Sequence, residues 1–136
     1  MKPVEWEEKY SVNVKEIDTQ HKNIVIFIND INENLEKGTD IKYFDNFFDR
    51  LLTHTITHFE TEEKYFDEFM FEGKEEHVKE HEKIKNIVME LQKKYIDSPN
   101  PTIIFETSNF LENWLINHII AFDKKYSQCF NKHGLF

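Results

Sequence analysis

The sequence predicts an all-α protein: an up-down-up-down antiparallel four-helix bundle with an irregular N-terminal arm and a short C-terminal helical extension. The first observation is that glycine and proline are rare, so that four long segments contain neither. The second is that apolar residues in each segment recur at spacings of three and four, which indicates one buried helix face. The third is that short connections join the segments, which favours antiparallel neighbours. The segments are residues 18–37, 39–72, 74–98 and 102–133.

The first two helices are predicted between Asp18 and Gly73. Asp18 is expected to be the N-cap of the first helix, and Gly38 to end it. Thr39 or Asp40 is expected to cap the second helix, which Gly73 would end. The inward stripes of these two helices are His21, Ile24, Ile28, Ile31 and Leu35, and then Phe44, Phe48, Leu51, Thr55, His58, Glu62 and Tyr65.

The third and fourth helices are separated by the segment 98–101, in which two prolines interrupt helical hydrogen bonding. Helix three is expected over 74–98 and helix four over 102–133. Their inward stripes are His77, His81, Ile84, Val88, Leu91 and Tyr95, and then Leu111, Leu115, His118 and Phe122.

Length and composition predict one cytoplasmic domain over residues 1–136, with an arm at 1–17 anchored by Trp6 and a bundle at about 18–130. A net charge of −9 argues against a nucleic-acid partner and against binding to an anionic membrane. The single cysteine, Cys129, excludes an internal disulfide and fits a reducing compartment. Neither a membrane-spanning apolar run nor a signal peptide is evident. We expect the protein to be a monomer.

Polar residues interrupt the inward stripes at six positions. A lone inward histidine is commonly a hydrogen-bonded core residue, but burying this many polar groups without strong partners would cost several kcal/mol each. In an up-down-up-down bundle all six also lie at the same end. The arrangement therefore predicts a metal site, formed by His21, His58, Glu62, His77, His81 and His118.

The types of ligand restrict the kind of metal. One tetrahedral zinc ion cannot use so many donors, and a structural zinc site would contain thiolates. Calcium and magnesium prefer oxygen ligands, whereas five of these six residues are histidines. Two first-row transition ions fit better, with carboxylates as bridges, although composition alone does not name the metal.

Four motifs resemble those of the hemerythrin family, and most closely those of the single-domain bacteriohemerythrins. Residues 17–22 are similar to the "DxQH" start of hemerythrin domains, and residues 58–63 match "HFxxEE". Residues 77–81 match "HxxxH", and residues 114–123 match "WLxxHIxxxD". The resemblance extends from Trp6 to about Cys129, with every motif position present.

This resemblance implies two non-haem iron ions bridged by an oxo or hydroxo group and by two carboxylates. One iron would be held by His77, His81 and His118, and the other by His21 and His58, with Glu62 and Asp123 as the bridges. Asp123 follows His118 by five residues, which is about 140° around a regular α-helix. Periodicity alone would place Asp123 at the solvent-exposed rim, and its role as a ligand favours a local π-bulge.

The resemblance also implies that dioxygen binds at an open position on the two-histidine iron. Apolar residues are expected to line that side, although each could equally be ordinary core: Ile24, Phe59, Trp114, Leu115 and Ile119. His54 is expected either to support His58 or to be a boundary residue, whereas His133 is expected to be solvated.

The predicted function is reversible dioxygen binding for storage, delivery or scavenging, and not catalysis. Two alternatives stay open: a di-iron enzyme that reduces dioxygen, peroxide or nitric oxide, and an oxygen or redox sensor that acts through a separate partner. Ferritin-like di-iron oxidases use Glu-x-x-His pairs, and no histidine in this chain has a glutamate three residues before it.

Overall fold

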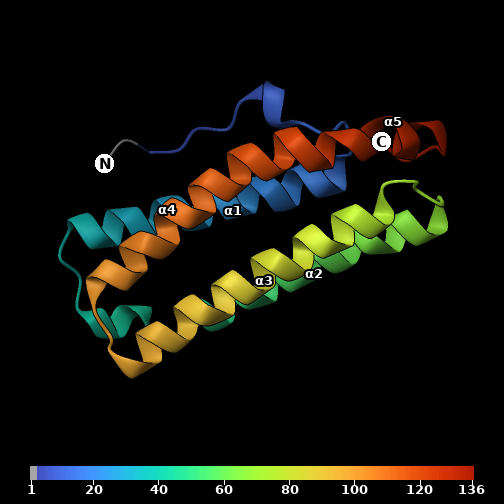
Figure 1. Cartoon of the computed structure of the whole chain (residues 1–136). Helices are drawn as coiled ribbons and strands as arrows, with labels where there is room; N and C mark the ends of the chain where they lie inside the picture. The colour runs from blue at the N-terminus through green and yellow to red at the C-terminus, as the bar shows by residue number, and fades with distance from the viewer. Residues whose placement is uncertain (1–2) are drawn as a thin grey trace.

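Four long helices run antiparallel in the computed structural model, which describes residues 3–136 (Figure 1). They are α1 (Lys15–Glu36), α2 (Phe47–Glu68), α3 (Lys74–Asp97) and α4 (Pro101–His118). A π-helix (Ile119–Asp123) and α5 (Lys124–Lys132) continue α4 past the bundle, and two 3-10 helices (Glu8–Tyr10 and Ile41–Phe44) lie in the arm and in the α1–α2 connection. The predicted four-helix bundle and its C-terminal extension are confirmed.

The start of α1 differs from its prediction. The helix begins at Lys15, and Val14 precedes it without a side-chain cap. Asp18 is therefore not an N-cap. Its carboxylate instead accepts hydrogen bonds from Ser11 Oγ at 2.6 Å and from the Val12 amide at 2.9 Å. The aspartate ties the arm to the first turn of the helix.

The connection between α1 and α2 contains a short 3-10 helix, which the sequence pattern predicted as part of the second helix. Gly38 has a φ of +66° and follows the end of α1, as predicted. Asp40 does act as a cap, but of the 3-10 helix, where its side chain accepts a hydrogen bond from the Lys42 amide. Helix α2 begins only at Phe47.

The prediction that Gly73 ends the second helix is wrong. Helix α2 ends at Glu68, and Met70 takes the left-handed conformation with a φ of +49°. Gly73 is the N-cap of α3. A Cβ atom there would lie 2.8 Å from Cζ of Phe71, so the folded-back phenyl ring leaves no room for a side chain. The break before α4 is as predicted, with Asn100 capping and Pro101 in the first turn.

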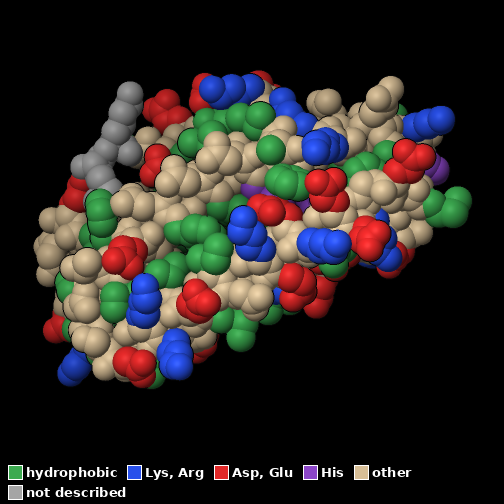
Figure 2. Space-filling view, viewed as in Figure 1, with side chains coloured by type: hydrophobic (Ala, Val, Ile, Leu, Met, Phe, Trp, Pro, Cys, Tyr) green, Lys and Arg blue, Asp and Glu red, His purple; other side chains and the backbone are tan. Residues whose placement is uncertain are grey.

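The two ends of the bundle are named by the connections they contain. We call the end with the connections 37–46 and 98–100 the distal end, and the end with the 69–73 connection the histidine end. Large apolar side chains fill the interior along its whole length, and charged side chains of both signs are interspersed on the outside (Figure 2). Among residues 3–136, no helix is both long and apolar enough to span a membrane.

Candidate metal centre

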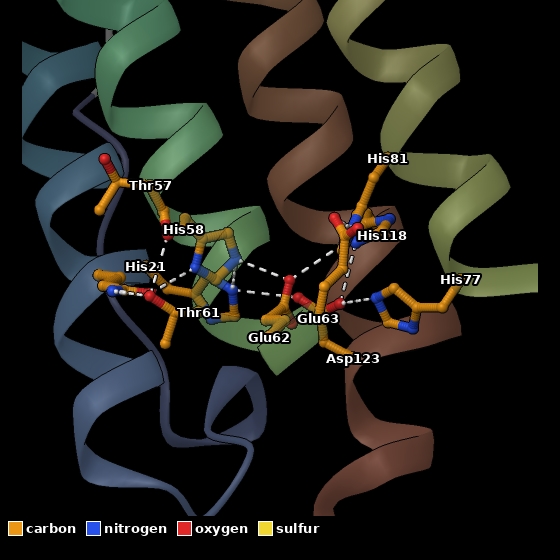
Figure 3. Close-up of polar contacts among 11 residues, drawn as sticks. His21, Thr57, His58, Thr61, Glu62, Glu63, His77, His81, His118 and Asp123 are labelled. Atoms are coloured by element: carbon orange, nitrogen blue, oxygen red, sulfur yellow. Dashed lines mark hydrogen bonds and ion pairs between the residues drawn. The ribbon is translucent and has the colours of Figure 1, made fainter. Parts of the chain in front are cut away.

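The structure brings together the seven residues predicted as metal ligands (Figure 3). All seven are buried, with at most 3% of any residue exposed. Every helix of the bundle contributes, because the starts of α1 and α3 and the finishes of α2 and α4 share the histidine end. The residues are His21 on α1, His58 and Glu62 on α2, His77 and His81 on α3, His118 at the end of α4, and Asp123 at the end of the π-helix.

The π-helix places Asp123 in the cluster. Its wider turn compensates for the five-residue spacing from His118, which would send the carboxylate away from the core in a regular α-helix. Asp123 Oδ1 lies 2.9 Å from Nε2 of His118 and 2.9 Å from Nε2 of His77. The predicted π-bulge is confirmed.

Both carboxylates contact histidines from both sides of the cluster. Glu62 Oε1 lies 3.1 Å from Nε2 of His81 and 3.2 Å from Nε2 of His58. Asp123 Oδ2 lies 3.0 Å from Nε2 of His21, while its other oxygen contacts His77 and His118. Two overlapping groups result, each with candidate ligand atoms within 4.8 Å of one another. They are Glu62, His77, His81, His118 and Asp123, and His21, His58, Glu62 and Asp123.

Hydrogen bonds outside the cluster determine the tautomer of His58. Thr61 Oγ1 donates to the Thr57 carbonyl and therefore accepts from Gln20 Nε2, at 3.1 Å. The amide oxygen of Gln20 then faces His58 Nδ1 at 2.7 Å, so this nitrogen must donate. In the neutral imidazole the lone pair of His58 is consequently on Nε2, which points into the cluster.

His81 has the same tautomer for a simpler reason. Its Nδ1 lies 3.0 Å from Oε2 of Glu63, and a carboxylate only accepts. Nε2 of His81 is therefore also a lone-pair donor, and it faces Glu62 Oε1. Two acceptors in contact repel each other unless a cation lies between them. Both oxygens of Glu62 and of Asp123 likewise have no hydrogen-bond partner among residues 3–136. The donor set fits a metal.

The cluster favours ionised carboxylates. Burial acts to raise the pKa of Glu62 and of Asp123, but the surrounding histidines outweigh it and hold both values below their usual range. Burial and the neighbouring His58 lower the pKa of His21. Burial acts to lower the pKa of His58 and of His118 as well, but the neighbouring Glu62 and Asp123 outweigh it and raise both values. The interior thus combines negative oxygens with imidazoles that carry positive charge readily, which shows that the carboxylates favour cations beside them.

The predicted oxygen-pocket residues are buried at this end: Ile24, Phe59, Trp114, Leu115 and Ile119. Phe59 stacks on His81 with ring centroids 3.8 Å apart and also contacts His58 at 5.8 Å. Trp114 stacks on His118 at 5.4 Å. The two aromatic rings therefore hold histidines of both groups in place.

Sequence reasoning missed three residues beside the cluster: Gln20, Glu63 and Tyr126. The first two each adjoin a predicted ligand in the chain. Tyr126 is fully buried, and burial together with the charges of Asp123 and Glu62 raises the pKa of its phenol well above the usual value. The phenol therefore keeps its proton.

The remaining histidines lie outside the cluster. His54 is exposed and contacts the ring of Phe27 at 6.0 Å, so it is a boundary residue. His133 is exposed and stacks on Phe69 at 4.9 Å, beside Cys129.

Comparison with known proteins agrees with this geometry. The family model described as "Hemerythrin HHE cation binding domain" matches residues 12–127. The chain is 28% identical over 121 residues to a bacteriohemerythrin of Methylococcus capsulatus, covering 89% of this chain and 91% of the relative. It is 27% identical over 124 residues to a hemerythrin-like protein of Naegleria gruberi, with 91% of each chain covered.

A solved structure shows the same arrangement of helices. A crystal structure of a hemerythrin variant with one substituted leucine superimposes with a TM-score of 0.83 and 27% identity. The match covers 95% of this chain and 98% of that chain. Since the family model matches most of the chain and the buried cluster fits a metal, the chain belongs to the hemerythrin family.

Proposed function

We propose that this protein binds dioxygen reversibly at a non-haem di-iron centre, for storage, delivery or scavenging. His77, His81 and His118 would hold one iron, and His21 and His58 the other. Glu62 and Asp123 would bridge the pair, together with an oxo or hydroxo group.

One observation carries the proposal: both carboxylates belong to both groups of candidate ligand atoms. A single ion would leave either the pair His21 and His58 or the three other histidines without a metal. Two ions use all five imidazoles and place each carboxylate between them. Imidazole and carboxylate donors suit iron, and the absence of thiolates disfavours softer ions.

The surroundings of the cluster favour binding over turnover. When bound, the iron pair supplies the electrons on which reversible binding of dioxygen depends. The chain supplies exclusion of water, because Leu115 and Ile119 are fully buried and carry no proton donor. An enzyme that reduces dioxygen further must deliver protons, and an apolar lining withholds them.

Repeated oxygenation tests the proposal. We would measure iron content, reduce the protein without oxygen, admit dioxygen and then remove it, while recording the visible spectrum. Two irons per chain and a spectrum that returns after each cycle are expected. One zinc per chain without an iron chromophore would refute the centre, and rapid irreversible oxidation or sustained turnover with reductant would favour the enzyme.

A polar substitution tests the role of the apolar lining. Leu115→Asn should admit water and accelerate oxidation to the inactive diferric form, with peroxide release measured in parallel. Leu111→Asn makes the same change one helical turn earlier, at another buried position of α4, and controls for general loosening of the core. Equal oxidation rates in the two variants would show that the apolar residues around Leu115 do not specifically slow oxidation.

A further inference from the structure

The two sides of the cluster differ in what supports their histidines. One histidine of each group donates from Nδ1 to a side chain: His58 to Gln20 at 2.7 Å, and His81 to Glu63 at 3.0 Å. Nδ1 of His21 and of His118 is buried and has no partner among residues 3–136. The supporting acceptor is thus a neutral amide on the two-histidine side and a carboxylate on the three-histidine side.

The chemical difference between these acceptors affects the metal-facing nitrogen. A carboxylate that accepts from Nδ1 draws the proton toward itself, which makes Nε2 a stronger donor. Glu63 can do this at little desolvation cost, because its side chain is 32% exposed while the His81 side chain is fully buried. Gln20 orients His58 equally well but adds no charge.

The position of Glu63 follows from the helix that also carries the bridging residue. Glu62 and Glu63 are neighbours on α2, so their side chains point about 100° apart around the helix. Glu62 points into the cluster and contacts Nε2 of His81, whereas Glu63 reaches Nδ1 of the same ring from outside. Together with the stacked ring of Phe59, these contacts hold the His81 imidazole on both edges and one face.

We propose that Glu63 is a positioning residue that raises the metal affinity of the three-histidine side beyond what its additional histidine provides, so that this side loads first. The inference rests on the two-metal centre proposed above. It deepens that proposal by assigning part of the inequality of the two sites, beyond the difference of one histidine, to one residue outside the set of metal ligands.

Zinc provides a diamagnetic probe of this inequality that does not require oxygen chemistry. Zn²⁺ would be titrated into metal-free protein by competition calorimetry, and the histidine nitrogens followed by 15N NMR. Wild type should bind two ions in two steps, with His81 Nε2 shifting at the first equivalent and His58 Nε2 at the second.

Three variants separate the charge of Glu63 from the hydrogen bond it accepts. Glu63→Gln keeps an acceptor for His81 but removes the charge, and it should weaken the first step on the order of tenfold while leaving the second unchanged. Gln20→Glu should strengthen the second step, because the Thr61 hydroxyl can turn from the Thr57 carbonyl to donate to the new carboxylate. Glu60→Gln removes the same charge from an exposed position on α2 and should change neither step.

The outcomes distinguish this inference from the proposed function. If wild type does not take up two zinc ions, the two-metal centre itself is refuted. If wild type binds two ions but Glu63→Gln behaves like Glu60→Gln, or weakens both steps equally, the role of Glu63 is refuted and the centre stands. The double variant Glu63→Gln with Gln20→Glu should bring the two steps closer together, and an unchanged separation between them would also overturn the inference.

Discussion

The distal end and the histidine end are built from the same four helices but are stabilised differently. At the distal end, aromatic rings pack on each other: Phe27 stacks on Phe47 at 5.1 Å, and Phe48 contacts Phe47 at 4.9 Å and Tyr95 at 5.6 Å. At the histidine end, aromatic rings also pack on one another, as Tyr126 does on Phe130 at 4.4 Å, but several pack on imidazoles as well, with Phe66 lying 4.8 Å from His77.

This difference indicates which end we expect a bound metal to stabilise. Burial of apolar surface stabilises the distal end without assistance. The histidine end buries two carboxylates and five imidazoles, so we expect bound cations to stabilise its folded form. Each of the four helices runs through both ends. The packed core of the distal end can therefore hold in place a polar cluster that would be unstable by itself.

Removal of metal should produce the largest effect. If each site binds with free metal at about a thousand times its dissociation constant, chelation lowers the free energy of unfolding by about 8 kcal/mol for two sites. Amide hydrogen exchange should then rise mainly in residues 15–24, 58–68, 74–81 and 115–126, while the distal end stays protected. Equal loss of protection at both ends, or none, would contradict the comparison.

A core truncation at the distal end should have a smaller effect and leave the metal in place. Phe48→Ala removes a ring that is 2% exposed, which costs about 3–5 kcal/mol of unfolding free energy. Denaturant unfolding measures the loss, and metal analysis of the folded fraction should match wild type.

The matched control makes the same substitution at the other end. Phe59→Ala on the same helix removes a ring that is 1% exposed and stacks on His81, so it should lower both stability and metal affinity. If Phe48→Ala loses metal as readily as Phe59→Ala, the two ends are not independent in the way proposed here.

The four helices and most of the cluster residues were predictable from the sequence, whereas Asp123 was not predictable from periodicity. Periodicity predicted the four helices because each buries a continuous stripe, and it located six of the cluster residues because they interrupt those stripes. Asp123 escaped periodicity because the π-helix brings it to the inside, whereas Phe122, which continues the predicted stripe, is only half-buried. Only the resemblance to a family identified Asp123.

Contacts between helices and local steric effects were less predictable. The hydrogen bonds of Gln20 to His58 and of Glu63 to His81 join different helices, and no spacing along one helix reveals them. The position of Gly73 depends on the ring of Phe71 folding back over it, and Asp18 is diverted from capping by the amide and hydroxyl groups of the arm. In each case the outcome depends on a contact with another residue, and the spacing of residues along the sequence does not reveal that contact.

The smallest predicted effect tests whether the distal end also uses a polar contact. The Tyr95 hydroxyl shares its one proton between two acceptors, the Ile41 carbonyl at 3.1 Å and Asp45 Oδ1 at 3.0 Å, which joins α3 to the connection between α1 and α2. Tyr95→Phe should lower the free energy of unfolding by about 1 kcal/mol at neutral pH and leave metal content unchanged. Tyr43→Phe, at an exposed tyrosine that donates to Asp30, should cost less.

The pH dependence of this difference gives a sharper measurement. Burial and the bond to Asp45 raise the pKa of Tyr95 from 10.0 to about 12. Because the folded state favours the protonated phenol, its contribution is fully present below pH 10 and is lost as the pH rises toward 12. The stability difference between wild type and Tyr95→Phe should therefore shrink over that interval. A difference that stays constant or grows with pH would show that the folded state does not favour the protonated phenol, and would contradict the hydrogen bond from Tyr95 to Asp45.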